Sequence, residues 1–84
     1  MPDPVAWTVV ERGWQVIGAA GEKLGYVDDV LGDPDADIFD GLSVSGGLFK
    51  ERRYVPAEQV GSIYAGEIHL LIDKNEFERL PPAQ

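Results

Sequence analysis

The chain has 84 residues and carries 15 Asp and Glu side chains against 7 Lys and Arg, a formal net charge of −8. This length provides for one small domain, and a hydrophobic content of 44% is typical of a folded protein. The negative charge repels phosphate backbones, so nucleic acid is not expected as a partner. The chain has no cysteine, no basic leader with an apolar core, and no apolar run near the roughly twenty residues that span a bilayer. We therefore expect a cytoplasmic protein without membrane insertion.

Glycine, proline and polar turns divide the first half of the chain into three predicted strands, at 14–18, 24–31 and 38–45. Apolar residues in the second of these recur every three positions, a spacing that a flat strand cannot place on one face. We therefore expect a bulge or sharp bend within it, at Gly25 or at the pair Asp28 and Asp29.

The connection after the third strand is expected to be longer than the glycine pair at 46–47. A two-residue hairpin there would place Glu51 opposite Leu42 and bring a carboxylate into the core. With a longer loop, residues 54–55 pair back toward Leu42 instead.

The fourth strand is expected to end at Pro56, which lacks the N–H that a central ladder requires. A closing hairpin follows, with strands at 60–64 and 67–72. A two-residue turn between them places Ile63 opposite Ile68, and leaves Val60 near Leu71 on the outer face.

The last segment carries the Asp-x-x-Glu pattern of a capped helix start at Asp73 and Glu76. One or two helical turns are expected to follow, with Phe77 and Leu80 packed over a barrel mouth. At the other end, residues 5–10 are read either as an extra strand or as an apolar arm.

These elements predict an all-β fold, a small SH3-like β-barrel of five to six strands, closed or nearly closed, with a short C-terminal helix. We divide the chain into an N-terminal arm or extra strand at 1–13, the barrel domain at 14–73, and the helix and tail at 74–84. The expected interior is formed by Val16, Leu24, Val27, Val30, Leu42, Val44, Val55, Ile63, Ile68 and Leu70.

Two segments carry a family resemblance. The run from Gly21 to Leu31, GEKLGYVDDVL, and the run from Arg53 to Val60, RYVPAEQV, are similar to the two halves of a PRC-barrel domain. With the strand between them they cover residues 14–73. The resemblance implies a stand-alone small β-barrel that works by contacting other proteins, as in the photosynthetic reaction-centre H subunit and a ribosome maturation factor.

The aspartates Asp33, Asp35, Asp37 and Asp40 are the candidate metal ligands, because their spacing concentrates carboxylate oxygens as calcium loops do. The segment fails as an EF-hand, since Ile38 replaces the required glycine and Val44 the bidentate glutamate. An exposed polar turn is the alternative interpretation. No metal and no other cofactor is expected.

The sequence offers no catalytic constellation, and an enzyme is not expected. The single histidine, His69, shares a strand face with Glu67 and is interpreted as a surface residue. The serines lack the flanking pattern of a nucleophile elbow.

The candidate partner-binding residues come from two groups. Apolar residues without an obvious place in the barrel are Trp7, Leu48, Phe49, Val60 and Leu71, and cations gathered near the fourth strand are Lys50, Arg52 and Arg53. Cross-strand pairing of these cations with Asp37 and Asp40 is an alternative role. The leading hypothesis is a protein-interaction module that forms a homodimer. The second hypothesis is a small-ligand or calcium-binding regulatory protein that uses the loop from Asp33 to Asp40.

Overall fold

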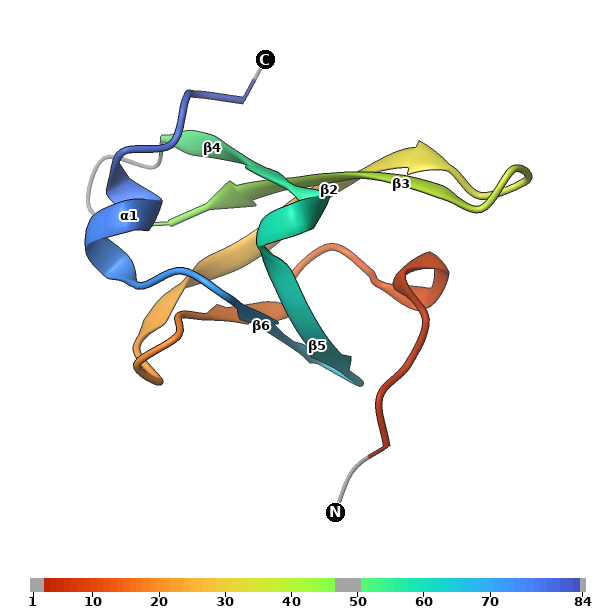
Figure 1. The fold of residues 1–84 in the computed structure, drawn as a ribbon, viewed down its shortest axis with the longest axis horizontal. Helices are drawn as coiled ribbons and strands as arrows, with labels where there is room; N and C mark the ends of the chain where they lie inside the picture. Colours follow the sequence, from red (N-terminus) through yellow and green to blue (C-terminus); the bar gives the residue numbers. More distant parts are fainter. Residues whose placement is uncertain (1–2, 47–50, 84) are drawn as a thin grey trace.

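The computed structural model describes residues 3–46 and 51–83. The described chain is mostly β-structure with one short α-helix (Figure 1). In chain order the elements are η1 (Trp7–Val9), β1 (Gln15–Ile17), β2 (Lys23–Asp33), β3 (Ile38–Ser45), β4 (Arg52–Pro56), η2 (Ala57–Gln59), β5 (Val60–Tyr64), β6 (Glu67–Leu70) and α1 (Lys74–Glu78). The all-β class, the number of strands and the short C-terminal helix are confirmed.

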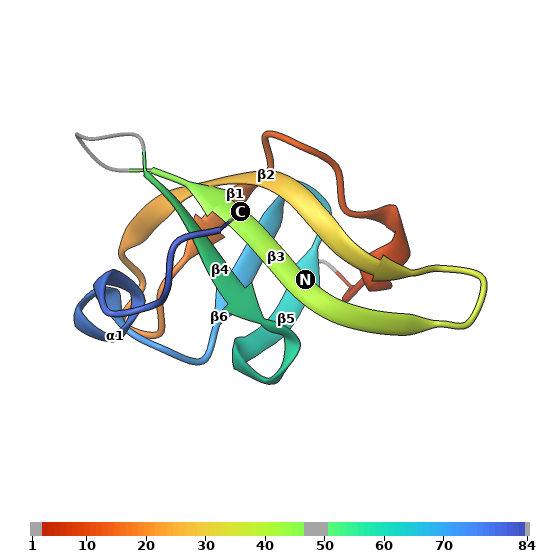
Figure 2. The same cartoon turned by 90° about the horizontal axis from the view of Figure 1, so that it is seen from above.

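The six strands form one sheet in the order β4-β3-β2-β1-β6-β5. Neighbouring strands are antiparallel except β1 and β6, which are parallel. Strands β4 and β5 follow each other in the chain, joined by η2, yet they lie at opposite ends of the sheet. The sheet curls so that the end of β4 and the start of β5 meet at η2 (Figures 1 and 2), but no ladder joins the two strands in the described residues. The predicted small barrel is thus an open one.

The curl of the sheet depends on bulges in β2, where both predicted bends occur. The β1–β2 register shifts opposite Gly25, and the β2–β3 register shifts between Val27 and Asp29. A further shift follows at Leu31 and Gly32. Bulges increase the local twist of a strand, which allows a long β2 to serve both halves of the sheet.

Gly25 also permits a close approach between two strands. A Cβ at this position would collide with the carbonyl oxygen of Ser45 and would lie 3.0 Å from the Cα of Gly46. Only glycine therefore fits here without displacement of the β3 backbone.

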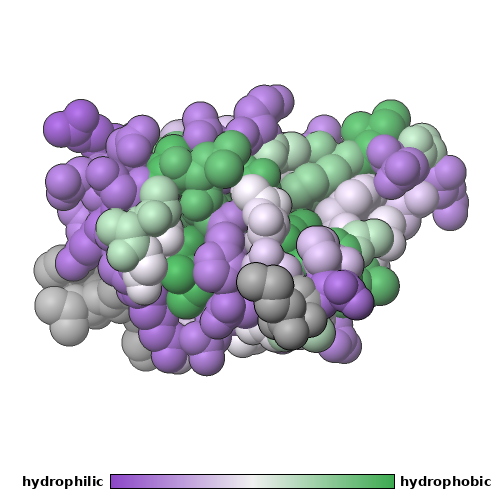
Figure 3. Space-filling model, turned by 60° about the horizontal axis from the view of Figure 1, so that its bottom comes forward, coloured by the Kyte–Doolittle hydropathy of each residue, from purple (hydrophilic) through white to green (hydrophobic). Residues whose placement is uncertain are grey.

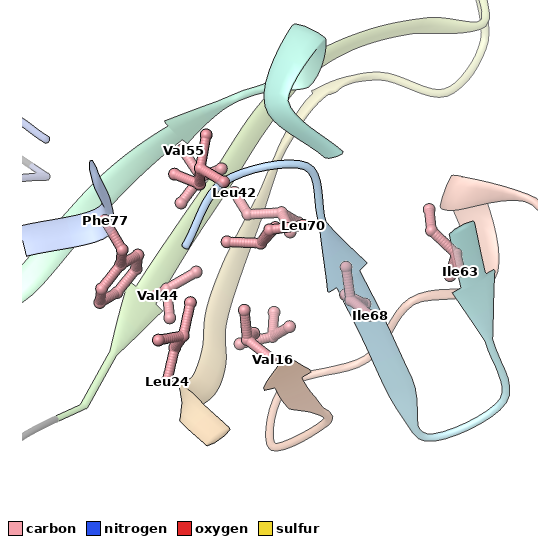
Figure 4. Packing of buried hydrophobic residues seen from close by; sticks show 11 residues of the cluster. Val16, Leu24, Leu42, Val44, Val55, Ile63, Ile68, Leu70 and Phe77 are labelled. Atoms are coloured by element: carbon pink, nitrogen blue, oxygen red, sulfur yellow. The ribbon is translucent and has the colours of Figure 1, made fainter. Parts of the chain in front are cut away.

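Apolar side chains from every strand fill the inside of the curl (Figure 4). Of the predicted interior residues, all but Val30 are buried, and Val30 packs against them half-buried. Ile72 and Phe77 complete the buried cluster. The pairing of Leu42 with Val55 across β3 and β4 confirms the longer loop expected after β3.

The helix α1 begins with the predicted capping box. The Asp73 side chain accepts a hydrogen bond from the backbone N–H of Glu76 at 2.9 Å, and Glu76 Oε1 accepts one from the backbone N–H of Asp73 at 3.4 Å. This start directs Phe77 inward, where it lies beside Val44 and Leu24 (Figure 4). The expected helix over a barrel mouth is therefore present.

Each edge strand of the open sheet is covered by another segment of the chain. At β5, the N–H of Val5 donates to the carbonyl of Ile63 at 2.8 Å. At β4, Pro82 forms an antiparallel bridge with Arg53. Exposed strand edges invite pairing with other chains, so these segments protect the sheet. Of the two interpretations of residues 5–10, the extra strand is not formed, and η1 lies there instead.

Candidate interaction surface

The predicted aspartate loop forms the end of the β2–β3 hairpin. Asp33 Oδ1 accepts hydrogen bonds from the backbone N–H groups of Asp35 at 3.1 Å and Ala36 at 3.4 Å. Asp37 adopts a left-handed backbone with φ 54°, and the Tyr54 hydroxyl donates to the backbone carbonyl of Asp40 at 2.9 Å. Over residues 3–46 and 51–83, no three metal-ligating side chains gather at one point.

Trp7 is held against this hairpin by two contacts. Its ring stacks on Phe39, with centroids 5.1 Å apart and planes inclined by 15°, and its Nε1–H donates to Asp37 Oδ1 at 3.0 Å. The side chain is half-buried and packs against the core cluster. A tryptophan that had no obvious place in the sequence thus joins the N-terminal segment to the hairpin.

Arg52 and Arg53 point to opposite faces of β4, because neighbouring residues of a strand alternate. Arg52 lies 3.5 Å from Asp28, and Arg53 lies 3.3 Å from Glu51 while donating to the carbonyl of Leu80 at 3.1 Å. For these two arginines the alternative pairing with Asp37 and Asp40 is wrong, because in the β3–β4 register they lie opposite Ser45 and Val44.

The remaining apolar candidates differ in exposure. Val60 pairs with Leu70 rather than lying near Leu71, and it is half-buried against the core. The expected position of Val60 was wrong because the β5–β6 register shifts between Val60 and Ile63. Leu71 is 62% exposed. The candidates Leu48, Phe49 and Lys50 lie outside the described residues.

The structure assembles a surface that the sequence did not predict as a unit. Four neighbouring strands, β2, β1, β6 and β5, turn one side away from the core, and cross-strand pairing aligns their residues. We call this side the outer face. It consists of Lys23, Tyr26, Gln15, Ile17, Glu67, His69, Leu71 and Tyr64.

Two rows of side chains cross the outer face. One row pairs Tyr26 with Gln15, Gln15 with Glu67, and Glu67 with Tyr64. The second row pairs Lys23 with Ile17 and Ile17 with His69. Paired residues point to the same side of a sheet, so each row is continuous.

Contacts between the two rows fix several side chains. The Lys23 ammonium lies 5.0 Å from the centre of the Tyr26 ring. The Tyr64 and His69 rings meet edge-on at 5.5 Å, and His69 Nε2 lies 2.7 Å from Glu67 Oε2. His69 therefore has polar and aromatic partners from its own sheet face.

Leu71 extends this face just beyond β6. A Cβ on Gly61 would lie 3.1 Å from Leu71 Cδ2, so the missing side chain of Gly61 makes room for Leu71. Figure 3 views the molecule from the side on which β1, β5 and β6 lie in Figure 1, and shows apolar patches separated by polar side chains.

Sequence reasoning identified part of this face. The alternation of Glu67, His69 and Leu71 with buried neighbours indicated one outer strand surface. It did not indicate that β1 lies beside β6, because a parallel pair between distant segments leaves no local turn signal. That pairing brings Tyr26 onto the same face as Tyr64, His69 and Leu71.

The described part of the chain contains no helix long and apolar enough to cross a membrane. No curated protein matches the sequence. The PRC-barrel domain family matches residues 12–79, which include every strand of the sheet and helix α1. This match covers well over half of the chain and agrees with the curled six-stranded sheet. The chain therefore belongs to the PRC-barrel domain family.

Proposed function

We propose that this PRC-barrel protein is a non-enzymatic, cytoplasmic interaction module that forms a homodimer through the outer face. The observation that carries the proposal is Leu71, an aliphatic side chain that is 62% exposed at the edge of a face with two tyrosines. Tyrosine and large apolar side chains are typical of the centres of protein interfaces.

Burial of Leu71 in a dimer interface supplies part of the driving force. Full burial of a leucine side chain contributes about 1.5–3 kcal/mol, so the exposed part of Leu71 provides about 1–2 kcal/mol per copy. In a symmetric dimer this contribution occurs twice.

The tyrosines of the outer face require little ordering when a partner binds. Tyr26 is placed beneath Lys23, and Tyr64 is placed against His69. Side chains that are already held lose less conformational entropy at an interface. The face is therefore suited to binding with limited rearrangement.

Charge distribution supports a second copy of the chain as the occupant. The whole chain has a net charge of −8, which opposes self-association in general. The outer face holds one lysine and one glutamate, Lys23 and Glu67, and the aspartates of the β2–β3 hairpin lie away from it. Two outer faces can therefore meet without strong repulsion.

Sedimentation equilibrium of the full chain tests this proposal. We expect a dimer for the natural chain and a monomer for Leu71→Asp, because the substitution places a carboxylate in the interface. The matched control is Ile38→Asp, which introduces the same charge at a 54% exposed aliphatic residue on the β2–β3 hairpin.

The Ile38→Asp chain should stay dimeric. A natural chain that is monomeric at all accessible concentrations would overturn the proposal. A Leu71→Asp chain that dimerises as strongly as the natural one would place the interface elsewhere. Circular dichroism shows whether both variants keep the natural fold.

A further inference from the structure

The edge of β4 is occupied by a short segment of the chain itself, residues 81–83, which we call the tail. The N–H of Tyr54 donates to the carbonyl of Pro81 at 3.0 Å, and the N–H of Ala83 donates to the carbonyl of Arg52 at 2.8 Å. These two bonds flank the antiparallel pair of Arg53 and Pro82. The edge of β4 therefore already accepts an extended peptide in a defined register.

This segment is an incomplete strand. In an antiparallel ladder, the residue opposite Tyr54 both accepts from its N–H and donates to its carbonyl. Pro81 accepts but has no N–H to donate. Pro82 likewise offers no donor on the side facing solvent, which prevents a further strand from adding to the segment. The tail thus holds the edge with fewer bonds than an ordinary strand would form.

The charges at this edge favour an acidic occupant. Arg52 is 58% exposed, and its one carboxylate contact in the described residues is Asp28 at 3.5 Å. The tail residue opposite Arg52 is Ala83, which offers no charge. A carboxylate at the same place in another peptide would lie on the same side of the ladder as Arg52.

We propose that the β4 edge is a binding site for an extended acidic peptide of another protein, and that residues 81–83 cover this site until the peptide displaces them. The bound peptide runs antiparallel to β4. It places a residue with an N–H opposite Tyr54 and an Asp or Glu opposite Arg52. Strand addition of this kind gains affinity from the backbone and specificity from side chains.

The displacement is local. The hydrogen bond from Arg53 to the carbonyl of Leu80 holds the chain just before the tail, so helix α1 and Phe77 stay in place when residues 81–83 leave. Pro81 and Pro82 are exposed, and neither belongs to the buried core cluster.

The test uses the synthetic peptide Thr-Leu-Val-Thr-Glu-Val-Thr, in which Val stands opposite Tyr54 and Glu opposite Arg52. Binding is followed through the backbone amide signals of Arg52 and Tyr54 in an NMR titration. The full chain is compared with Ala83→Pro, which removes the one N–H that the tail donates to β4, and with the matched control Ala83→Gly, which keeps it.

We expect Ala83→Pro to bind the peptide about tenfold more tightly than the natural chain or Ala83→Gly, because the tail no longer competes. Replacing the peptide's Glu with Lys should weaken binding, and replacing its first Val with Pro should weaken it as well.

Three results would overturn the proposal. The first is continued protection of the Tyr54 amide from hydrogen exchange in Ala83→Pro, because it means that other contacts hold the tail on β4. The second is a titration in which the peptide shifts only the amide signals of outer-face residues, because the peptide then binds at that face and not at β4. The third is dimerisation of Ala83→Pro through β4 without peptide binding, because the occupant of the edge is then a second copy of the chain.

Discussion

The indole ring of Trp7 lies nearly parallel to the ring of Phe39, with centroids 5.1 Å apart, and connects the N-terminal segment to the β2–β3 hairpin. The same indole donates a hydrogen bond to Asp37. One side chain thus fixes both the segment that covers the β5 edge and the hairpin turn. This position makes Trp7 a structural residue of the fold.

Replacement of Trp7 tests this role. Trp7→Ala removes the stacked ring and the hydrogen bond, and we expect a loss of about 2–3 kcal/mol in the free energy of unfolding. Trp7→Phe keeps a ring against Phe39 and removes only the N–H, so its loss should be about 1 kcal/mol. Urea titration measures both. Equal stability of Trp7→Ala and the natural chain would show that the stack contributes nothing.

The sequence predicted the local parts of this fold well. The pairing of Ile63 with Ile68 follows from a short turn and strand alternation, and it is confirmed. The position of Val60 was wrong, because a bulge depends on packing as well as on the turn. Similarly, no local sequence pattern predicts the contact between Trp7 and Phe39, since this contact depends on how the finished sheet curls.

For the candidate site, too, the sequence predicted a local feature and missed the long-range arrangement. Leu71 was recognised as an apolar residue without a place inside, and its exposure agrees with that reading. The sequence did not predict the outer face as a whole, because this face forms only when β1 pairs in parallel with β6. Strand order depends on long-range packing, which a single sequence does not encode in any short pattern.

The capping box at the start of α1 gives a second prediction. Asp73→Ala removes the acceptor for the Glu76 N–H and should lower the free energy of unfolding by about 1 kcal/mol. Asp73→Asn keeps a side-chain acceptor and should lose much less. Thermal unfolding compares the two variants. Because the buried Phe77 is carried by this helix, an unaffected Asp73→Ala chain would mean that core packing alone positions α1.

A third prediction concerns the close approach of β2 and β3. Gly25→Ala should destabilise the fold by about 1–3 kcal/mol, because the added methyl group collides with the Ser45 carbonyl oxygen. Gly46→Ala should have a similar effect, since its Cβ would collide with the carbonyl of Leu24. The double variant should lose less than the sum, because one shift of the backbone relieves both collisions. Additive losses in chemical unfolding would contradict this coupling.

Calcium provides a fourth test, directed at the aspartate loop. Asp33 accepts two backbone N–H bonds of the turn, and Asp37 accepts the Trp7 N–H. A bound cation would have to compete with these donors, so millimolar calcium should leave the melting temperature unchanged. A rise of several degrees would show binding to the folded state, and its loss in Asp35→Asn would assign the site to this loop.

The neighbouring arginines of β4 give a matched pair for the last prediction. The Arg53 side chain is 23% exposed and donates to the Leu80 carbonyl, whereas the Arg52 side chain is 58% exposed and forms, within the described residues, an ion pair with Asp28 alone. Arg53→Ala should therefore cost about 1 kcal/mol of unfolding free energy, because a half-buried carbonyl loses its donor. Arg52→Ala should cost less than about 0.5 kcal/mol, since exposed ion pairs contribute little. Urea titration of both variants decides the order, and a larger loss for Arg52→Ala would assign the structural role to the ion pair with Asp28 instead.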